Sequence, residues 1–238
     1  MLEAINISKK FGNKTILHSV NISVKAGEIV GLVGPNGAGK TTSFYILVGL
    51  LKADKGEIYL EKENITKKPL YKRARKGLCY LPQNSSIFKK LTVKENLQCA
   101  MEVKKLKKDK RDQLTRELLK KFSIRKIENS YGYSLSGGER RKVEIARTLI
   151  LNPKFLLLDE PFSGIDPVTI QDIKKIIKTL STEGIGILIT DHNVREALEI
   201  CEKVYVLSEG SILAEGVPSS ILSNEKVREV YLGTNFKI

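Results

Sequence analysis

The N-terminal part of the chain follows a pattern that is typical of β-strands. Residues 2–8 and 16–24 are rich in apolar positions and flank a turn signal, Gly12-Asn13. Residues 28–33 form a largely apolar run, which predicts a strand that is buried on both faces. The pattern therefore predicts a small antiparallel sheet, followed by the first strand of a second, buried sheet.

Strands and helices alternate through most of the remaining chain. Strand-like runs occupy residues 56–60, 78–81, 155–158, 185–190 and 204–208, and helical patterns occupy residues 41–51, 168–182 and 194–202. Alternation of this kind predicts a parallel sheet that is covered on both faces. The expected fold class is α/β, with a mainly parallel sheet, an N-terminal antiparallel β subdomain and a small α-helical subdomain.

The helical subdomain is expected near the middle of the chain. Between residues 92 and 122, leucines recur at helical spacing among charged residues, and another helical pattern follows Gly138. We expect residues 1–238 to form a single domain. Its core would comprise residues 1–83 and 151–238, and its helical subdomain would comprise about residues 84–150.

The composition is that of a folded protein with a strongly basic surface. The chain has 238 residues, of which 41% are hydrophobic, and a formal net charge of +14. Residues 89–126 contain 14 Lys or Arg against 5 Asp or Glu, so this segment alone carries +9. Such a segment fits nucleic acid, an anionic membrane surface or a solvated helix face. No RNA-binding aromatic motif, zinc pattern or helix-turn-helix signal accompanies it, so the charge leaves the partner open.

Targeting signals and paired cysteines are absent from the sequence. No apolar run approaches about 18 residues, the length that crosses a bilayer, and the N-terminus lacks the basic and apolar regions of a signal peptide. Cys79, Cys99 and Cys201 are too widely spaced to form a CxxC pair, which predicts reduced thiols. We therefore expect a cytoplasmic protein.

A glycine-rich loop follows the buried strand at residues 28–33. Residues 34–41 match the pattern GxxxxGK[ST], with a predicted strand before it and a predicted helix after it. The glycines allow backbone N–H groups to face phosphates, and the helix N-terminus adds positive potential. Lys40 is expected to reach the β- and γ-phosphates, and the Thr41 hydroxyl to ligate Mg²⁺. The loop predicts a P-loop NTPase core, whose nucleotide-binding residues are Gly34, Pro35, Asn36, Gly37, Ala38, Gly39, Lys40, Thr41 and Thr42.

Two acids follow the strand at residues 155–158. Carboxylates at the carboxyl end of a parallel strand lie where such sheets bind ligands. Asp159 is suited to hold Mg²⁺, and Glu160 is suited to be the general base that orients the attacking water. Together with the phosphate-binding loop, this pair predicts hydrolysis of ATP in the presence of Mg²⁺.

The segment Leu135-Ser136-Gly137-Gly138-Glu139 lies between these two motifs and resembles the signature of ATP-binding cassette (ABC) proteins. The resemblance implies that Ser136, Gly137 and Gly138 contact the γ-phosphate of a nucleotide held by a second copy. A helix start suits that task, because its free N–H groups bind anions. The resemblance therefore implies a homodimer with two shared nucleotide sites.

The resemblance to ABC proteins covers nearly the whole chain and implies further roles. Phe11 would stack on adenine, although an aromatic side chain at a strand edge is an alternative. Gln83 would sense Mg²⁺ and take part in catalysis, and His192 would contact the γ-phosphate. Residues 163–166 would form the loop that crosses the dimer interface, with Ile165 in place of the commoner leucine.

Among cassettes, the chain most closely resembles the ATPase subunits of lipopolysaccharide exporters. The resemblance rests on residues 77–83, 86–88, 138–147 and 190–196 and on the ending, residues 230–236. It implies two transmembrane partner subunits that dock at a groove near Gln83 and Phe88, and a peripheral place on the cytoplasmic face of the inner membrane.

Two other classes of cassette remain as alternatives. Branched-chain amino-acid importers loosely share the motif at residues 77–83, whereas Asn193 and the ending at residues 230–236 favour the exporter. A soluble cassette that acts on ribosomes or DNA would fit the basic charge. The single cassette and the lack of a heptad run argue against it, so we expect no nucleic-acid partner.

Overall fold

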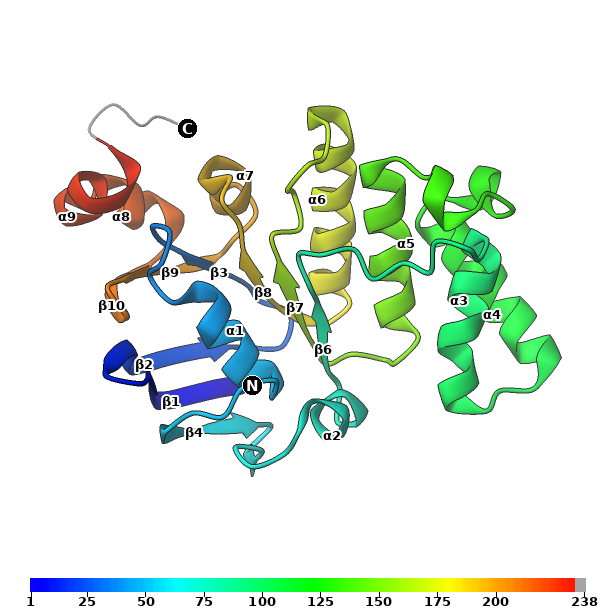
Figure 1. Ribbon diagram of the computed structural model, residues 1–238. Helices are drawn as coiled ribbons and strands as arrows, with labels where there is room; N and C mark the ends of the chain where they lie inside the picture. The colour runs from blue at the N-terminus through cyan, green and yellow to red at the C-terminus, as the bar shows by residue number, and fades with distance from the viewer. Residues whose placement is uncertain (234–238) are drawn as a thin grey trace.

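The computed structural model describes residues 1–233, the side chain of Val103 excepted, as two sheets with a group of helices at one end (Figure 1). The first sheet is antiparallel and has the strand order β2-β1-β4-β5. Its strands are β1 (Leu2–Phe11), β2 (Lys14–Val24), β4 (Lys55–Leu60) and β5 (Glu63–Asn64). The predicted N-terminal antiparallel sheet is confirmed, and β5 was not predicted because two exposed residues leave no pattern.

The second sheet has the strand order β10-β9-β3-β8-β7-β6. Neighbouring strands are parallel from β9 to β6, and only the edge strand β10 is antiparallel to its neighbour. The strands are β3 (Ile29–Val33), β6 (Leu78–Leu81), β7 (Phe155–Asp159), β8 (Gly186–Thr190), β9 (Lys203–Ser208) and β10 (Ser211–Gly216). The mainly parallel sheet expected from the sequence is therefore confirmed.

Both faces of the parallel sheet are buried. Along β7, Leu156 and Leu158 belong to one hydrophobic cluster, and Phe155 and Leu157 belong to the other. The first cluster is completed by α6 (Pro167–Thr182) and α7 (Val194–Leu198), and the second by α1 (Lys40–Val48) and the antiparallel sheet. A single run of apolar residues thus packs against two different layers.

A group of helices lies between β6 and β7 in the chain. Its elements are α3 (Val93–Met101), η1 (Glu102–Lys104), α4 (Lys108–Lys121), η2 (Arg125–Ile127), η3 (Gly132–Ser134) and α5 (Gly137–Leu149). The group lies beyond α6, at the opposite end of the molecule from the C-terminal helices (Figure 1). These helices confirm the helical pattern, whereas the subdomain boundaries at about residues 84–150 stay a prediction.

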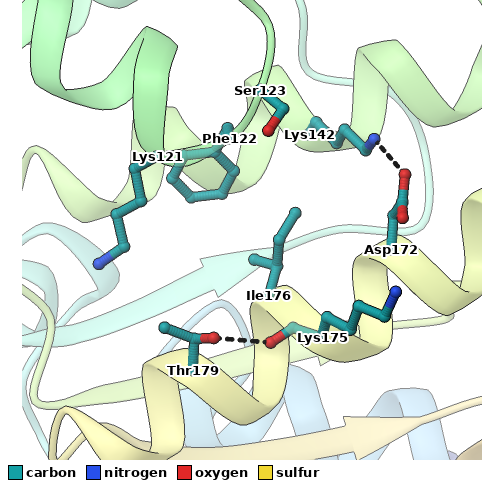
Figure 2. Close-up of a pocket in the computed structure, with 8 residues that line it drawn as sticks. All are labelled: Lys121, Phe122, Ser123, Lys142, Asp172, Lys175, Ile176 and Thr179. Atoms are coloured by element: carbon teal, nitrogen blue, oxygen red, sulfur yellow. Dashed lines mark hydrogen bonds and ion pairs between the residues drawn. The ribbon is translucent and has the colours of Figure 1, made fainter.

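An ion pair and an apolar contact are among the contacts that attach this group of helices to α6. Lys142 of α5 pairs with Asp172 of α6 at 2.8 Å. Phe122, which follows α4, lies opposite Ile176 in a pocket of about 230 Å³ (Figure 2). An exposed ion pair contributes little to stability. The buried ring of Phe122 is therefore the stronger of the two attachments.

The C-terminal part of the chain packs beside β9 and β10. It contains α8 (Pro218–Ser223), α9 (Glu225–Val227) and the π-helical turn η4 (Arg228–Leu232). Thr234, Asn235 and Phe236 of the ending noted in the sequence lie outside the described residues. Within residues 1–233, no helix is both long enough and apolar enough to span a bilayer.

The three cysteines are free thiols. Cys79 and Cys201 are buried, and burial raises the pKa of the first thiol to about 11 and that of the second to about 12. A thiol with so high a pKa is a poor nucleophile at neutral pH. Both side chains therefore serve as small core residues.

A buried arginine caps the C-terminal end of α1. The sequence predicted a helix over residues 41–51, but the chain leaves the helix at Gly49, whose φ is 85°. Arg73, on α2 (Leu70–Arg75), is only 2% exposed and donates hydrogen bonds to the carbonyl oxygens of Ile46 and Leu47 at 2.8 and 2.6 Å. The guanidinium thus meets the negative end of the helix dipole, while burial lowers its pKa to about 10.

Replacing Arg73 by methionine is expected to destabilise the fold. The change leaves carbonyl groups at the end of α1 without a donor, which costs about 3 kcal/mol. For a chain of this size, that loss corresponds to a fall in Tm of roughly 6–12 °C. Thermal unfolding followed by circular dichroism measures it. Arg75→Met, on the exposed side of α2, is the matched control, and an equal fall in both variants would contradict the capping role.

Candidate nucleotide-binding and catalytic site

The carboxyl end of the parallel sheet opens into a pocket of about 580 Å³. It is lined by Phe11, Lys14, Ile16, Asn36, Gly37, Gly39, Lys40, Thr41, Thr42, Gln83, Glu160, Thr190 and His192. Residues from five separate segments of the chain meet here. Most of the site residues expected from the sequence are among them, and Lys14, Ile16 and Thr190 are additions.

The glycine-rich loop connects β3 to α1 and closes one side of the pocket. Gly34 has a φ of 150°, and a Cβ atom there would lie 2.0 Å from the carbonyl oxygen of Leu207. Gly39 has a φ of 106°, and a Cβ atom there would lie 2.6 Å from Leu17. Both positions therefore require glycine for backbone conformation and for space.

Lys40, the first residue of α1, lies deep in the loop. Its ammonium group donates hydrogen bonds to the carbonyl oxygens of Gly34 at 2.7 Å and of Pro35 at 2.9 Å. Burial lowers the pKa of Lys40, and the negative charges of Glu160 and Asp159 oppose that shift. Gly34 and Pro35 do not line the pocket themselves, but they hold the ammonium group that does.

Glu160 is the centre of the opposite wall. Its carboxylate accepts a hydrogen bond from Gln83 Nε2 at 2.6 Å and lies 2.6 Å from His192 Nε2. Its backbone has a φ of 47°, an uncommon conformation for glutamate, and its N–H donates to the carbonyl oxygen of Thr190 at 2.7 Å. Gln83 and His192, two of the three residues expected to be catalytic, thus both contact the third, Glu160.

Asp159 lies behind this wall and is 4% exposed. Its Oδ2 accepts a hydrogen bond from the hydroxyl of Tyr80 at 3.0 Å. Burial raises the pKa of Asp159, and the hydrogen bond from Tyr80 opposes that shift. Tyr80 was not predicted as a site residue. Its position on the strand that leads to Gln83 was the one available signal.

The signature segment is not part of this pocket. Ser136 is the N-cap of α5 and forms a capping box with Glu139. Ser136 and Gly137 are exposed, whereas Gly138 is buried, and a Cβ atom on Gly138 would lie 2.1 Å from Thr169 of α6. Gly138 is therefore needed for the packing of two helices. The contact of these residues with a second copy stays a prediction.

Polar residues in the middle of α5 hold the loops that carry Gln83 and Glu160. Arg141 donates hydrogen bonds to the carbonyl oxygens of Pro82 at 3.1 Å and of Glu160 at 2.8 Å. It also pairs with Glu144 at 3.4 Å, and both side chains are buried. Burial lowers the pKa of Arg141, and the charge of Glu144 opposes that shift.

The loop after Gln83 is anchored to the same helix. Glu144 accepts hydrogen bonds from the hydroxyl of Ser85 and from the backbone N–H of Ser86, both at 2.7 Å. The guanidinium of Arg147 lies 5.1 Å from the ring centroid of Phe88. These roles of Arg141, Glu144 and Arg147 were missed, because charged residues in a helical pattern are usually solvated.

Buried Asn96 also holds the backbone of Phe88. Its side-chain amide accepts a hydrogen bond from the backbone N–H of Phe88 at 2.9 Å and donates one to the carbonyl oxygen of the same residue at 3.0 Å. The Phe88 side chain nevertheless stays 49% exposed. An exposed aromatic ring on a fixed backbone is a feature of interaction sites.

Comparison with known proteins identifies the class to which the site belongs. Residues 17–163, more than half of the chain, match the family model described as ABC transporter. The chain therefore belongs to the ABC transporter family, as one of its ATP-hydrolysing cassettes. Residues 211–237 also match a model described as branched-chain amino acid ATP-binding cassette transporter. The ending at residues 230–236 therefore does not separate exporters from importers, contrary to the expectation from the sequence.

Within that family, the whole chain is similar to lipopolysaccharide export system ATP-binding proteins, LptB. It is 49% identical to LptB of Haemophilus influenzae over 239 residues, which covers 100% of this chain and 99% of the relative. It is also 49% identical to LptB of Escherichia coli K12 over 238 residues, with the same coverage.

Solved structures of cassettes share the fold. A nucleotide-free ATP-binding cassette has a TM-score of 0.89 and 32% identity, and the match covers 98% of this chain and 99% of the other. The dimeric structure of MJ0796, a bacterial ABC transporter cassette, has a TM-score of 0.82 and 28% identity, with coverage of 92% and 99%.

Glu144→Gln is expected to loosen the segment that follows Gln83. The amide keeps the shape of the side chain but removes the charge that accepts hydrogen bonds from Ser85 and Ser86, a loss of about 1.4 kcal/mol, or tenfold. Hydrogen exchange of residues 83–88 should accelerate by about this factor, as read by mass spectrometry. Glu117→Gln, on the exposed face of α4, is the control. Unchanged exchange in Glu144→Gln would contradict the anchoring role.

Proposed function

We propose that this chain is the ATP-hydrolysing subunit of a lipopolysaccharide exporter. The contact of Glu160 with Gln83 and His192, across one pocket from the phosphate-binding loop, supports the ATPase. The 49% identity to LptB over the whole chain supports lipopolysaccharide as the exported substrate.

The triphosphate of ATP would lie along the loop between Gly34 and Thr42. Backbone N–H groups and the start of α1 supply positive potential there, and the buried ammonium group of Lys40 supplies a full charge. Phe11 lines the same pocket and is 51% exposed, and the ammonium group of Lys9 lies 5.5 Å from its ring centroid. Its exposed ring surface would stack on adenine.

Glu160 would act as the general base. A carboxylate that is fixed by two neighbours can orient a water molecule and accept its proton as the bond to the γ-phosphate forms. Gln83 and His192 supply this fixation, because each lies 2.6 Å from one oxygen of the carboxylate. His192 is more exposed than Glu160, which suits a contact with the γ-phosphate as well.

Mg²⁺ would be held by Thr41, Gln83 and Asp159. A hydroxyl, an amide oxygen and a carboxylate form the oxygen ligand set that this ion prefers. Within residues 1–233, no cluster of three or more His, Cys, Asp or Glu could hold a metal ion alone, which fits an ion shared with phosphate oxygens. When bound, Mg²⁺ neutralises charge that develops on the phosphates.

Two copies of the chain would share each nucleotide. Ser136 and Gly137 are exposed at the start of α5 and do not line the pocket of their own copy, so a second copy can receive them. The dimeric cassette of MJ0796 gives a precedent in a protein of the same fold. The γ-phosphate would then bridge the copies, and hydrolysis would remove the bridge.

Two transmembrane subunits would dock at the groove near Gln83 and Phe88, on the cytoplasmic face of the inner membrane. The exposed ring of Phe88 and its fixed backbone support this surface. A branched-chain amino-acid importer is the second candidate, and the match of residues 211–237 favours it. Identity over the whole chain outweighs that short match.

Glu160→Gln is expected to separate binding from hydrolysis. The amide keeps the size of the side chain but cannot accept a proton, so phosphate release should fall by roughly 10²–10⁴-fold. ATP should still bind and should hold the chain as a dimer on size-exclusion chromatography. Glu63→Gln, far from the pocket, is the control. Wild-type turnover in Glu160→Gln would refute the general-base role.

Tyr80→Phe is expected to weaken metal binding without abolishing nucleotide binding. The variant loses the hydrogen bond that orients the Asp159 carboxylate, a loss of about 1.5–2 kcal/mol, so the affinity for the metal ion should fall by roughly 10–30-fold. Paramagnetic resonance of Mn²⁺ in the presence of a non-hydrolysable nucleotide measures the affinity directly. Tyr59→Phe on β4 is the control, and an unchanged Mn²⁺ affinity in Tyr80→Phe would contradict the prediction.

Co-purification from membranes tests the transported substrate. The tagged chain should bring down two transmembrane subunits together with lipopolysaccharide, detected by mass spectrometry and by carbohydrate staining. Phe88→Glu should lose these partners and keep its ATP binding. Recovery of amino-acid permease subunits instead of the exporter would replace the proposal with the importer.

A further inference from the structure

A second pocket, of about 450 Å³, lies within the group of helices between α3, α4 and η2. Four cationic side chains line it: Lys94, Arg116, Lys120 and Arg125. None of the four takes part in an ion pair or a side-chain hydrogen bond within residues 1–233. The basic segment of the sequence thus contains a pocket whose four cationic side chains form no ion pair within residues 1–233.

The cations lie near like charges as well as near opposite ones, such as Asp112 four residues before Arg116. Arg116 and Lys120 are four residues apart on α4, where like charges repel each other. Lys94 is the second residue of α3, at the positive end of the helix dipole. A bound anion would relieve both repulsions at once.

The three carboxylates of the pocket offset part of its positive charge, but they form no ion pair with the four cations within residues 1–233. Asp112 accepts a hydrogen bond from Gln98 at 3.1 Å, and Glu117 accepts one from Gln113 at 2.9 Å. Glu128 completes the acidic lining, and it too forms no ion pair with the four cations within residues 1–233. The cations remain available to a ligand that carries more than one negative oxygen.

Two backbone contacts connect the start of α3, beside this pocket, to a segment with exposed aromatic side chains. The N–H of Lys94 donates to the carbonyl oxygen of Glu128 at 2.9 Å, and Thr92 is bridged to Tyr131. The rings of Tyr131 and Tyr133 stack at 5.5 Å, and they are 46% and 64% exposed. Tyrosine beside unpaired lysine is typical of protein surfaces at the membrane–water interface.

We propose that the pocket of Lys94, Arg116, Lys120 and Arg125 binds the phosphate of an anionic lipid headgroup. This inference rests on the proposed function, which brings the helical group close to the cytoplasmic leaflet. The leaflet is negatively charged, and each Lys or Arg near its surface strengthens binding. The lipid contact would orient the cassette beneath its transmembrane partners.

The lining of the pocket argues against nucleic acid as the occupant. Sites for single-stranded nucleic acid combine a positive groove with aromatic rings on which bases stack. The pocket contains no aromatic side chain among its lining residues. The nearby tyrosines stack on each other, which leaves one open face at most on each ring.

Vesicle binding by the purified full-length chain tests the proposal. Wild type should bind vesicles that contain phosphatidylglycerol and should not bind vesicles of phosphatidylcholine alone. The double variant Arg116→Gln/Lys120→Gln should bind the anionic vesicles roughly thirtyfold more weakly. The matched control is Lys67→Gln/Lys72→Gln, which removes two exposed charges near α2. It should bind nearly as tightly as wild type.

Three outcomes would overturn the proposal. Equal losses in the two double variants would mean that net charge alone drives binding. Binding of inorganic phosphate at least as tight as that of the anionic vesicles would assign the pocket to free anions, and tighter binding to RNA than to anionic vesicles would assign it to nucleic acid. ATP hydrolysis should be the same in both double variants. Vesicle binding and co-purification with the exporter are separate measurements, so the two proposals can fail independently.

Discussion

The catalytic end of the sheet depends on the buried ion pair between Arg141 and Glu144. A buried pair stabilises a fold only when hydrogen bonds satisfy the remaining donors and acceptors of both partners. Here the guanidinium reaches carbonyl groups that follow β6 and β7, and the carboxylate reaches the loop of Ser85 and Ser86. Two loops from different strands are therefore fixed by two residues of one helix, Arg141 and Glu144.

The same helix joins three regions with different tasks. α5 begins at the signature, where Gly138 packs directly against Thr169 of α6. Its middle holds the backbone of Glu160, and Arg147 near its end lies against Phe88. Any rigid displacement of α5 therefore moves the signature, the catalytic carboxylate and the exposed aromatic side chain together.

Much of the architecture and of the candidate site could be predicted, because the relevant signals are local. Short apolar runs that end at polar residues or glycines predicted the strands of the parallel sheet. The spacing of Gly34, Gly39 and Lys40 predicted the phosphate-binding loop. β10 was missed because its apolar residues, Ile212, Leu213 and Ala214, are consecutive and show no alternation with polar residues. The roles of Tyr80 and Glu144 were missed because their partners, Asp159 and Ser85, lie 79 and 59 residues away.

Glu160 illustrates the limit of sequence reasoning in another way. The strand and the acid pair were predicted from apolar residues followed by two carboxylates. The sequence could not predict the positive φ of Glu160 or the hydrogen bond from its N–H to Thr190. Both follow from the pairing of β7 with β8. Tertiary structure imposes this conformation on a residue that rarely adopts it.

The double restraint on Phe88 has a consequence for the assembly of a transporter. Asn96 fixes the backbone of this residue through two hydrogen bonds, and Arg147 packs against its ring. A surface that is ordered before its partner arrives loses little conformational entropy on association. The rate at which cassette and membrane subunits combine would then be set by diffusion and charge, not by a search through loop conformations.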